Sequence, residues 1–207
     1  MGMTELKLEG VHHISCITAD ATANVEFYAG VMGMRLVKKT VNQDDPSVYH
    51  LFFGDEKGSP GFDLTFFEYP GARKGRAGAG MVHRILWRVA SGDALDFWKK
   101  RLADNSIETE RTPDGLLFAD PEGLHHELLV YGGTDERLVP GHIEVPPEFA
   151  LQGFHGARAY SASPQVTAQV LEEVMGFTPS EPGEWILEGD QRSGVYYLDP
   201  PPEERGI

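Results

Sequence analysis

The sequence predicts an α+β protein of three βαβββ units, whose curved mixed sheets surround a concave pocket. The first evidence is a repeat: residues 8–12, Leu-Glu-Gly-Val-His, return as residues 151–155, Leu-Gln-Gly-Phe-His. At the same spacing, Val-Met-Gly at 31–33 returns at 174–176. The spacing of this repeat is 143 residues. At about half of it, 71 residues, Val11-His12 returns as Val82-His83. A strand followed by a helix therefore begins three times.

The first unit shows the pattern most clearly. We expect a strand over Val11–Thr18 and then a helix over Ala21–Met32, with Asp20 as N-cap and Gly33 as the stop. Apolar residues recur at helical spacing between these limits. Three strands should follow, at 35–41, 48–54 and 63–69.

The second and third units repeat this order. In the second we expect a strand over Val82–Val89, a helix over Asp93–Asp104, and strands near 108–111, 115–119 and 124–131. In the third we expect a strand over Phe154–Ser161, a helix over Pro164–Met175 with Ser163 as N-cap, and strands near 184–188 and 194–198.

The predicted organisation follows from the Gly- and Pro-rich segments between the units. The units span residues 8–69, 81–132 and 151–200, with a linker at 133–150 and the start of a further linker at 201–207. Two such units side by side would form an eight-stranded sheet around a pocket, and units one and two could pair in this way. The orphan third unit would need a fourth unit or another subunit, so we expect a homo-oligomer.

Composition limits the kinds of partner. The 207 residues carry a formal net charge of −14, which disfavours nucleic acid and anionic membranes as partners. No apolar run approaches the roughly 18 residues of a membrane span, and the single cysteine, Cys16, excludes a disulfide framework within one chain. We therefore expect a cytoplasmic protein with a small-molecule or protein partner.

Two adjacent histidines on the first strand are the leading candidates for chemistry. His12 shares its repeat position with His83 and His155, which predicts a common structural role such as a backbone hydrogen bond. The position of His13 is occupied by Arg84 and Gly156 in the other units, so His13 is the exception and the better functional candidate. Because side chains alternate along a strand, we expect the two imidazoles to face opposite sides unless a bulge intervenes.

The last strand of unit two offers a second candidate. His125 and Glu127 lie two residues apart on one face, a combination that suits Fe, Mn or Zn. A salt bridge between Glu127 and Arg84 is the alternative, and we favour it over the metal site.

Several segments of unit one together resemble one family. They are Val11-His-His-Ile-Ser15, Arg35–Pro46, Tyr49–Asp55, Gly58-Ser-Pro-Gly61 and Gly75-Arg-Ala-Gly78. The chain resembles the vicinal oxygen chelate superfamily of glyoxalases, bleomycin-resistance proteins and extradiol dioxygenases, and within it the hydroquinone-type ring-cleaving dioxygenases. Asp120-Pro-Glu-Gly123 and Gly153-Phe-His155 extend a looser resemblance over the rest of the chain.

The resemblance implies a site built around Fe(II) or Mn(II), an aromatic diol substrate and O₂. It implies that His13 is a metal ligand and that His12 lies beside the substrate as a proton acceptor. The other ligands, a His and a Glu, are implied to come from a fourth unit, which this sequence does not contain, so a truncated and inactive form is included in this hypothesis.

Two other functions remain open at this stage. A metal-dependent lyase or isomerase of glyoxalase type would use His13, Glu127 and His83. A non-catalytic protein of the same fold would bind a small ligand in the pocket.

Overall fold

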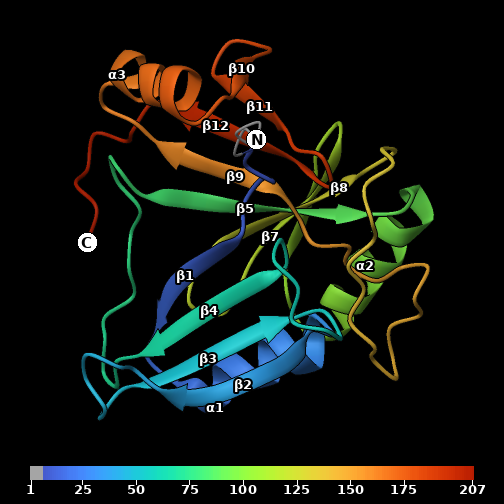
Figure 1. Ribbon diagram of the computed structural model, residues 1–207. Coiled ribbons are helices and arrows are strands. Elements are labelled where there is room, and N and C mark those ends of the chain that lie inside the picture. The colour runs from blue at the N-terminus through green and yellow to red at the C-terminus, as the bar shows by residue number, and fades with distance from the viewer. Residues whose placement is uncertain (1–6) are drawn as a thin grey trace, which may run out of the picture.

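The computed structural model describes residues 7–207 (Figure 1). The first unit consists of β1 (His13–Thr18), α1 (Ala21–Val25), a π-helical turn η1 (Glu26–Val31), β2 (Arg35–Val41), β3 (Tyr49–Gly54) and β4 (Asp63–Glu68). The second consists of β5 (Val82–Val89), α2 (Gly92–Asp104), β6 (Thr109–Arg111), β7 (Gly115–Ala119) and β8 (His125–Val130). The third consists of β9 (Phe154–Tyr160), α3 (Pro164–Gln169), η2 (Val170–Val174), β10 (Thr178–Pro179), β11 (Glu184–Glu188) and β12 (Ser193–Asp199).

These elements confirm the predicted α+β class, and they follow the predicted order except that the short strand β10 was not predicted. Two differences are local. The helices predicted at 21–32 and 164–175 each change from α to π geometry halfway, at η1 and η2. The first strand begins at His13 rather than at Val11.

The helix ends were predicted from single residues. Asp20 caps α1, because its carboxylate accepts from the amides of Thr22 and Ala23 at 2.9 and 3.0 Å. Gly33 has a φ of +66°, which suits a glycine just past a helix end. Ser163 occupies the predicted N-cap position of α3, but its side chain accepts no capping hydrogen bond, and Pro164 follows it at the first helical position.

The pairing of the units differs from the prediction. Units two and three share one eight-stranded sheet of order β10-β11-β12-β9-β5-β8-β7-β6, joined where β5 and β9 run antiparallel. Unit one forms a separate sheet of order β1-β4-β3-β2, so the unit without a sheet partner is the first and not the third. The reason is visible in the core, where unit one contacts unit two through buried side chains rather than through a strand edge.

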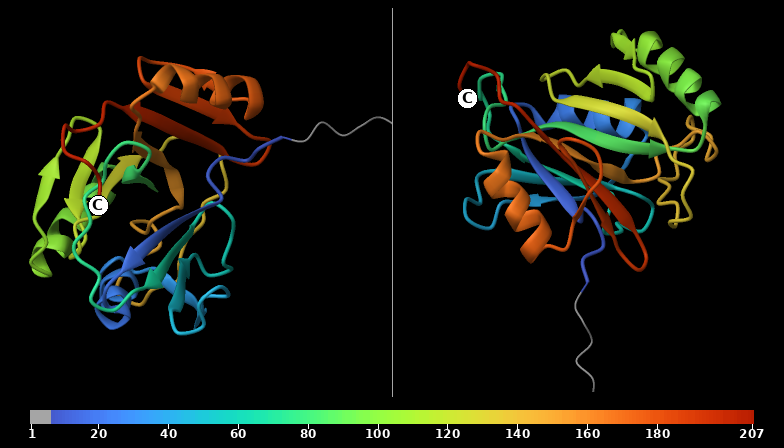
Figure 2. Two further views of the ribbon diagram at one scale, coloured as in Figure 1. Left: turned by 90° about the vertical axis from the view of Figure 1, so that its left-hand side faces the viewer. Right: turned by 90° about the horizontal axis from the view of Figure 1, so that it is seen from above.

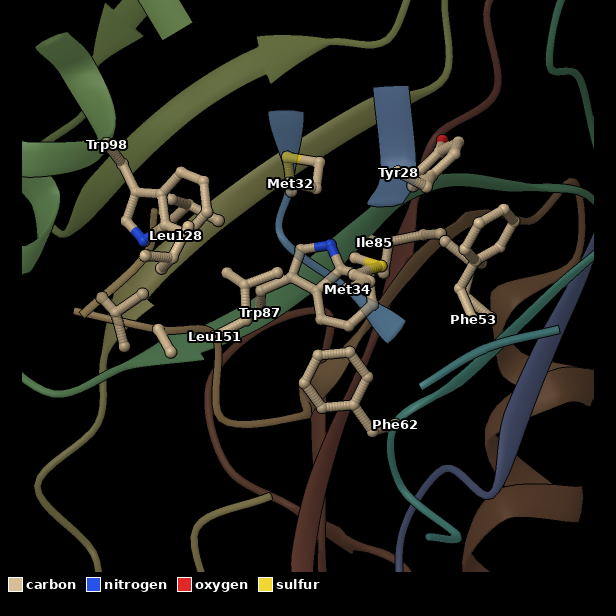
Figure 3. Packing of buried hydrophobic residues seen from close by; sticks show 14 of the residues in the cluster. Tyr28, Met32, Met34, Phe53, Phe62, Ile85, Trp87, Trp98, Leu128 and Leu151 are labelled. Carbon is tan, nitrogen blue, oxygen red and sulfur yellow. The ribbon is translucent and has the colours of Figure 1, made fainter. Parts of the chain in front are cut away.

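Figure 3 shows this shared core. Phe62 of unit one packs against Trp87 of β5, with ring centroids 5.3 Å apart. The largest fully buried side chains of this cluster include Phe154 of unit three and, from units one and two, Tyr28, Met32, Met34, Phe53, Phe62, Phe66, Trp87 and Trp98. Burial of each such side chain contributes about 1.5–3 kcal/mol, so this interface stabilises the two units together.

A buried chain of hydrogen bonds crosses the same core. Trp87 Nε1 donates to His126 Nδ1 at 3.0 Å. His126 Nδ1 must therefore be the acceptor nitrogen, and Nε2–H donates to the hydroxyl of Tyr28, 3.0 Å away. Tyr28 in turn donates to Asp120 at 2.8 Å. Every polar group in this chain has a partner, as buried groups require.

Unit three has a smaller core of its own, formed by Leu171, Phe177, Trp185, Leu187 and Leu198. Its helix α3 and the helix α2 of unit two lie at opposite ends of the molecule (Figures 1 and 2).

Two segments outside the strands tie the units together. The Gly-rich segment at 70–80 pairs with the end of the chain, because the amides and carbonyls of Arg76 and Ile207 exchange hydrogen bonds of 2.9 and 3.0 Å. In the linker at 133–150, Asp135 forms a 2.6 Å ion pair with the buried Arg88 and accepts from Ser193. None of the helices in the described part of the chain is long and apolar enough to span a membrane.

Candidate active site

Strand β1 presents His13 on the open face of the four-stranded sheet. Its side chains alternate: Ile14 and Cys16 pack against the core, whereas His13, Ser15 and Ile17 are exposed. No strand in residues 7–207 pairs with the outer edge of β1. His13 therefore lies on the exposed face of an edge strand. We call this face, with His13, Ser15, Asp63, Thr65 and His50, the first cup.

His12 lies beside His13 rather than on the opposite face. The two Nδ1 atoms are 3.2 Å apart, the rings are nearly perpendicular, and both residues are exposed. The expectation of opposite faces was wrong because β1 begins at His13, so His12 precedes the strand and its alternation does not apply. A hydrogen bond between the two nitrogens requires that only one of them carries a proton.

The floor of the first cup comes from β3 and β4. Asp63 is the strand partner of His13, and burial raises the pKa of its carboxyl. Thr65 donates a 3.0 Å hydrogen bond to the hydroxyl of Ser15. His50 stacks on Phe67 with ring centroids 3.9 Å apart, and burial lowers the pKa of its imidazole.

Sequence reasoning gave no role to His50 or Asp63. The signal that finds them is the period of two along β3 and β4, combined with the register that aligns Asp63 with His13 and His50 with Phe67. That register was not available from one sequence.

The first cup holds only part of a metal-ligand set. The imidazoles of His13 and His50 are chemically suitable ligands for Fe(II) or Mn(II). However, the described residues contain no group of three or more His, Cys, Asp or Glu side chains placed to hold a metal ion.

Glu127 and His83, the less favoured candidates, belong to the eight-stranded sheet. Arg84 donates to Glu127 at 2.9 Å, which confirms the predicted salt bridge, and Thr112 donates to the other oxygen at 3.0 Å. His83 Nε2 lies 2.8 Å from Asp199, and its ring stacks on Tyr160. Neither residue makes a hydrogen bond to His13.

The common role predicted for His12, His83 and His155 is not observed. His12 contacts His13, and His83 contacts Asp199. The Nδ1 atom of His155 has no hydrogen-bond partner among the described residues, and burial lowers the pKa of this imidazole to about 4. The repeat therefore preserves the backbone position but not the side-chain contacts.

Residues 10–128 match the family model of the Glyoxalase/Bleomycin resistance protein/Dioxygenase superfamily. The chain belongs to this superfamily. A crystal structure from Bacillus subtilis, described as that of a dioxygenase, superposes with a TM-score of 0.86 at 40% identity, covering 97% of this chain and 66% of that one. Maize glyoxalase I superposes with a TM-score of 0.65 at 16% identity, covering 96% of this chain and 69% of that one, and shows the fold alone.

Curated relatives of this superfamily member carry names of ring-cleaving enzymes. MhqO of Bacillus subtilis, named as a ring-cleaving dioxygenase, is 44% identical over 82% of this chain and 55% of its own length. MhqE of the same organism, named likewise, is 36% identical over 98% of this chain and 68% of its own length. The chlorohydroquinone/hydroquinone 1,2-dioxygenase of Sphingobium indicum is 32% identical over 92% of this chain and 58% of its own length. The chain thus spans little more than half of MhqO and of the Sphingobium enzyme.

Proposed function

We propose that this chain forms the larger part of a ring-cleaving dioxygenase for hydroquinone- or catechol-type diols. The observation that carries the proposal is the exposed pair His12–His13 on the open edge strand of a chain 44% identical to a protein named as a ring-cleaving dioxygenase. The substrates are the aromatic diol and O₂. A cytoplasmic location and a lack of nucleic-acid or membrane partners are part of the same proposal.

Dioxygenases of this superfamily are typically metal-dependent, and we propose Fe(II) or Mn(II) here. His13 is the proposed first ligand, because its imidazole is exposed in the first cup and is not buried in a salt bridge. A facial set of two imidazoles and a carboxylate leaves positions at which the metal, when bound, can hold the diol and O₂. The remaining ligands would come from outside the residues described.

The fold supports a place for those ligands. By the repeat, β1 is the counterpart of β5 and β9, which pair with each other along their equivalent edges. The free edge of β1 is therefore the place at which a further βαβββ unit would complete a second eight-stranded sheet. We propose that residues 201–207 begin the linker to such a unit, or that a second subunit supplies it.

His12 is the proposed proton acceptor. The His12 ring lies beside that of His13, with their Nδ1 atoms 3.2 Å apart, so a diol bound next to His13 would have a phenolic proton near the His12 imidazole. With the proton of the neutral imidazole on Nδ1, toward His13, the lone pair of His12 Nε2 would accept the phenolic proton.

Oxygen uptake tests the proposal. Protein expressed from its natural gene, loaded with Fe(II) without air, is mixed with hydroquinone in an oxygen electrode. We expect consumption of one O₂ per hydroquinone, loss of that consumption in His13→Ala, and ring-opened product by mass spectrometry. Substrate turnover without O₂ consumption would overturn the proposal in favour of a lyase or isomerase, and no turnover with iron bound would overturn it in favour of a binding protein.

A further inference from the structure

The eight-stranded sheet carries a pocket of its own on its concave face, formed by different residues from those of the first cup. The pocket has a volume of about 240 Å³. It is lined by Leu86, Asp114, Glu127, Leu129, Val130, His155, Arg158 and Tyr197. We propose that this pocket, the second cup, binds a neutral hydroxylated aromatic molecule of one ring without a metal. The inference does not depend on the proposed ring cleavage, since it uses the other sheet.

The strand register brings the lining residues to one face. Leu86 of β5 is the strand partner of Glu127 of β8, and Arg158 of β9 is the partner of Tyr197 of β12. Partners in a sheet point to the same side. The four side chains therefore line one concave surface, to which units two and three both contribute.

The size of the pocket fits a single ring. A cavity of about 150 Å³ in an engineered protein interior binds benzene. The second cup, at about 240 Å³, has room for one ring with one or two hydroxyl groups.

The charges in the second cup favour a neutral ligand. Glu127 is paired with Arg84 at 2.9 Å, and Arg158 is paired with Asp199 through two hydrogen bonds of 2.8 and 2.7 Å. Within each pair the two opposite charges neutralise each other, and the carboxylate of Asp114 at the rim, unpaired among the described residues, further disfavours an anion. A charged ligand would have to compete with them, whereas a neutral one can enter without breaking either pair.

The hydrogen-bonding groups favour a ligand that donates. Each oxygen of Glu127 accepts only one bond, from Arg84 or Thr112, although a carboxylate oxygen can accept two. Asp114 is exposed at the rim and makes no hydrogen bond or ion pair with any described residue. A phenolic O–H supplies the missing donor, and the ring can pack on Leu86, Leu129 and Tyr197.

The test uses 4-fluorophenol and ¹⁹F NMR on EDTA-treated protein. We expect saturable binding near the millimolar range, typical of a ligand of this size. Binding should weaken about tenfold or more in Leu129→Trp, which fills the pocket, and remain unchanged in Val166→Trp, a matched enlargement on exposed α3. The affinity for 4-fluoroanisole, which lacks the O–H donor, should be about fivefold or more lower than the affinity for 4-fluorophenol.

A second variant separates this site from the first cup. His13→Ala should bind 4-fluorophenol as the natural protein does, even where it has lost metal and oxygen uptake. Absence of saturable binding, tighter binding of 4-fluorobenzoate than of the phenol, or loss of binding in His13→Ala with retention in Leu129→Trp would each overturn the proposal. If Leu129→Trp does not fold, nuclear Overhauser effects between the probe and the Tyr197 ring decide the matter, since their absence contradicts binding there.

Discussion

The guanidinium of Arg84 donates to the carboxylate of Glu127 at 2.9 Å, at the strand position of unit two where unit one carries His13. The two sheets therefore use one position differently. In the eight-stranded sheet a protein cation neutralises the carboxylate of the last strand. In the four-stranded sheet the same position holds the exposed imidazole of His13, the proposed metal ligand.

Loss of Arg84 should destabilise the protein. In Arg84→Met the buried carboxylate of Glu127, 7% exposed, keeps only the hydrogen bond from Thr112. Because an unpaired buried charge is costly, we expect a loss of about 2–4 kcal/mol in the free energy of unfolding by urea. Arg84→Met combined with Glu127→Gln should recover most of this loss, and a double variant as unstable as the single one would contradict the account.

Tyr28→Phe tests the buried hydrogen-bond chain between units one and two. The change removes one hydroxyl and leaves Asp120 and His126 each without a partner at that point. We expect a loss of about 1–3 kcal/mol in the free energy of unfolding. Phe27→Leu offers a conservative change at the neighbouring core residue for comparison. A Tyr28→Phe variant as stable as the natural protein would contradict the assignment of this chain.

The stability of the protein should fall as the pH is lowered. Burial lowers the pKa of His126 to about 3, from its ordinary value of 6.5. Between these values the unfolded chain binds a proton and the folded protein does not, so this stability is fully present above pH 6.5 and is lost towards pH 3. The slope should reach about 1.4 kcal/mol per pH unit.

His126→Gln provides the comparison, because glutamine does not titrate. Urea unfolding at several pH values should show a shallower slope for the variant than for the natural protein. Asp120, whose pKa is raised by burial, acts in the opposite direction in both proteins and so does not affect the difference. Equal slopes would show that His126 titrates normally in the folded state.

Gly78→Ala should release the end of the chain without unfolding the rest. A Cβ at Gly78 would lie 2.3 Å from the amide nitrogen of Gly206. We expect faster hydrogen exchange at the amides of Arg76 and Ile207, with the free energy of global unfolding changed by less than about 0.5 kcal/mol. Gly92→Ala, where a Cβ meets no atom within 4 Å, is the control. Unchanged exchange at Arg76 and Ile207 would contradict the described pairing.

The elements of the fold could be predicted from the sequence because their signals are local. The repeat of Leu8–His12 at 151–155 located the units, and glycines such as Gly33 marked the ends of helices. The pairing of the units could not be predicted, since it depends on which side chains become buried between them. Phe62 and Trp87, 25 residues apart in sequence, pack together and join unit one to unit two without a shared sheet.

The candidate site could be predicted in part. His13 stood out because its repeat counterparts differ in chemistry, and the Arg84–Glu127 pair followed from strand alternation. The direction of the His12 side chain depends on where β1 begins. Sequence propensity does not fix the first residue of a strand to within two residues. Asp63 and His50 enter the first cup only through strand register, which is a tertiary property.

Iron content of His13→Ala tests the central claim most directly. The natural protein, His13→Ala and His125→Ala are each loaded with Fe(II) without air, desalted, and analysed for iron per protein. His125 is the matched control, because it is also an exposed strand histidine but lies on the eight-stranded sheet. We predict that iron is lost in His13→Ala and retained in His125→Ala. Unchanged iron in His13→Ala would contradict the role of the first cup as the metal site.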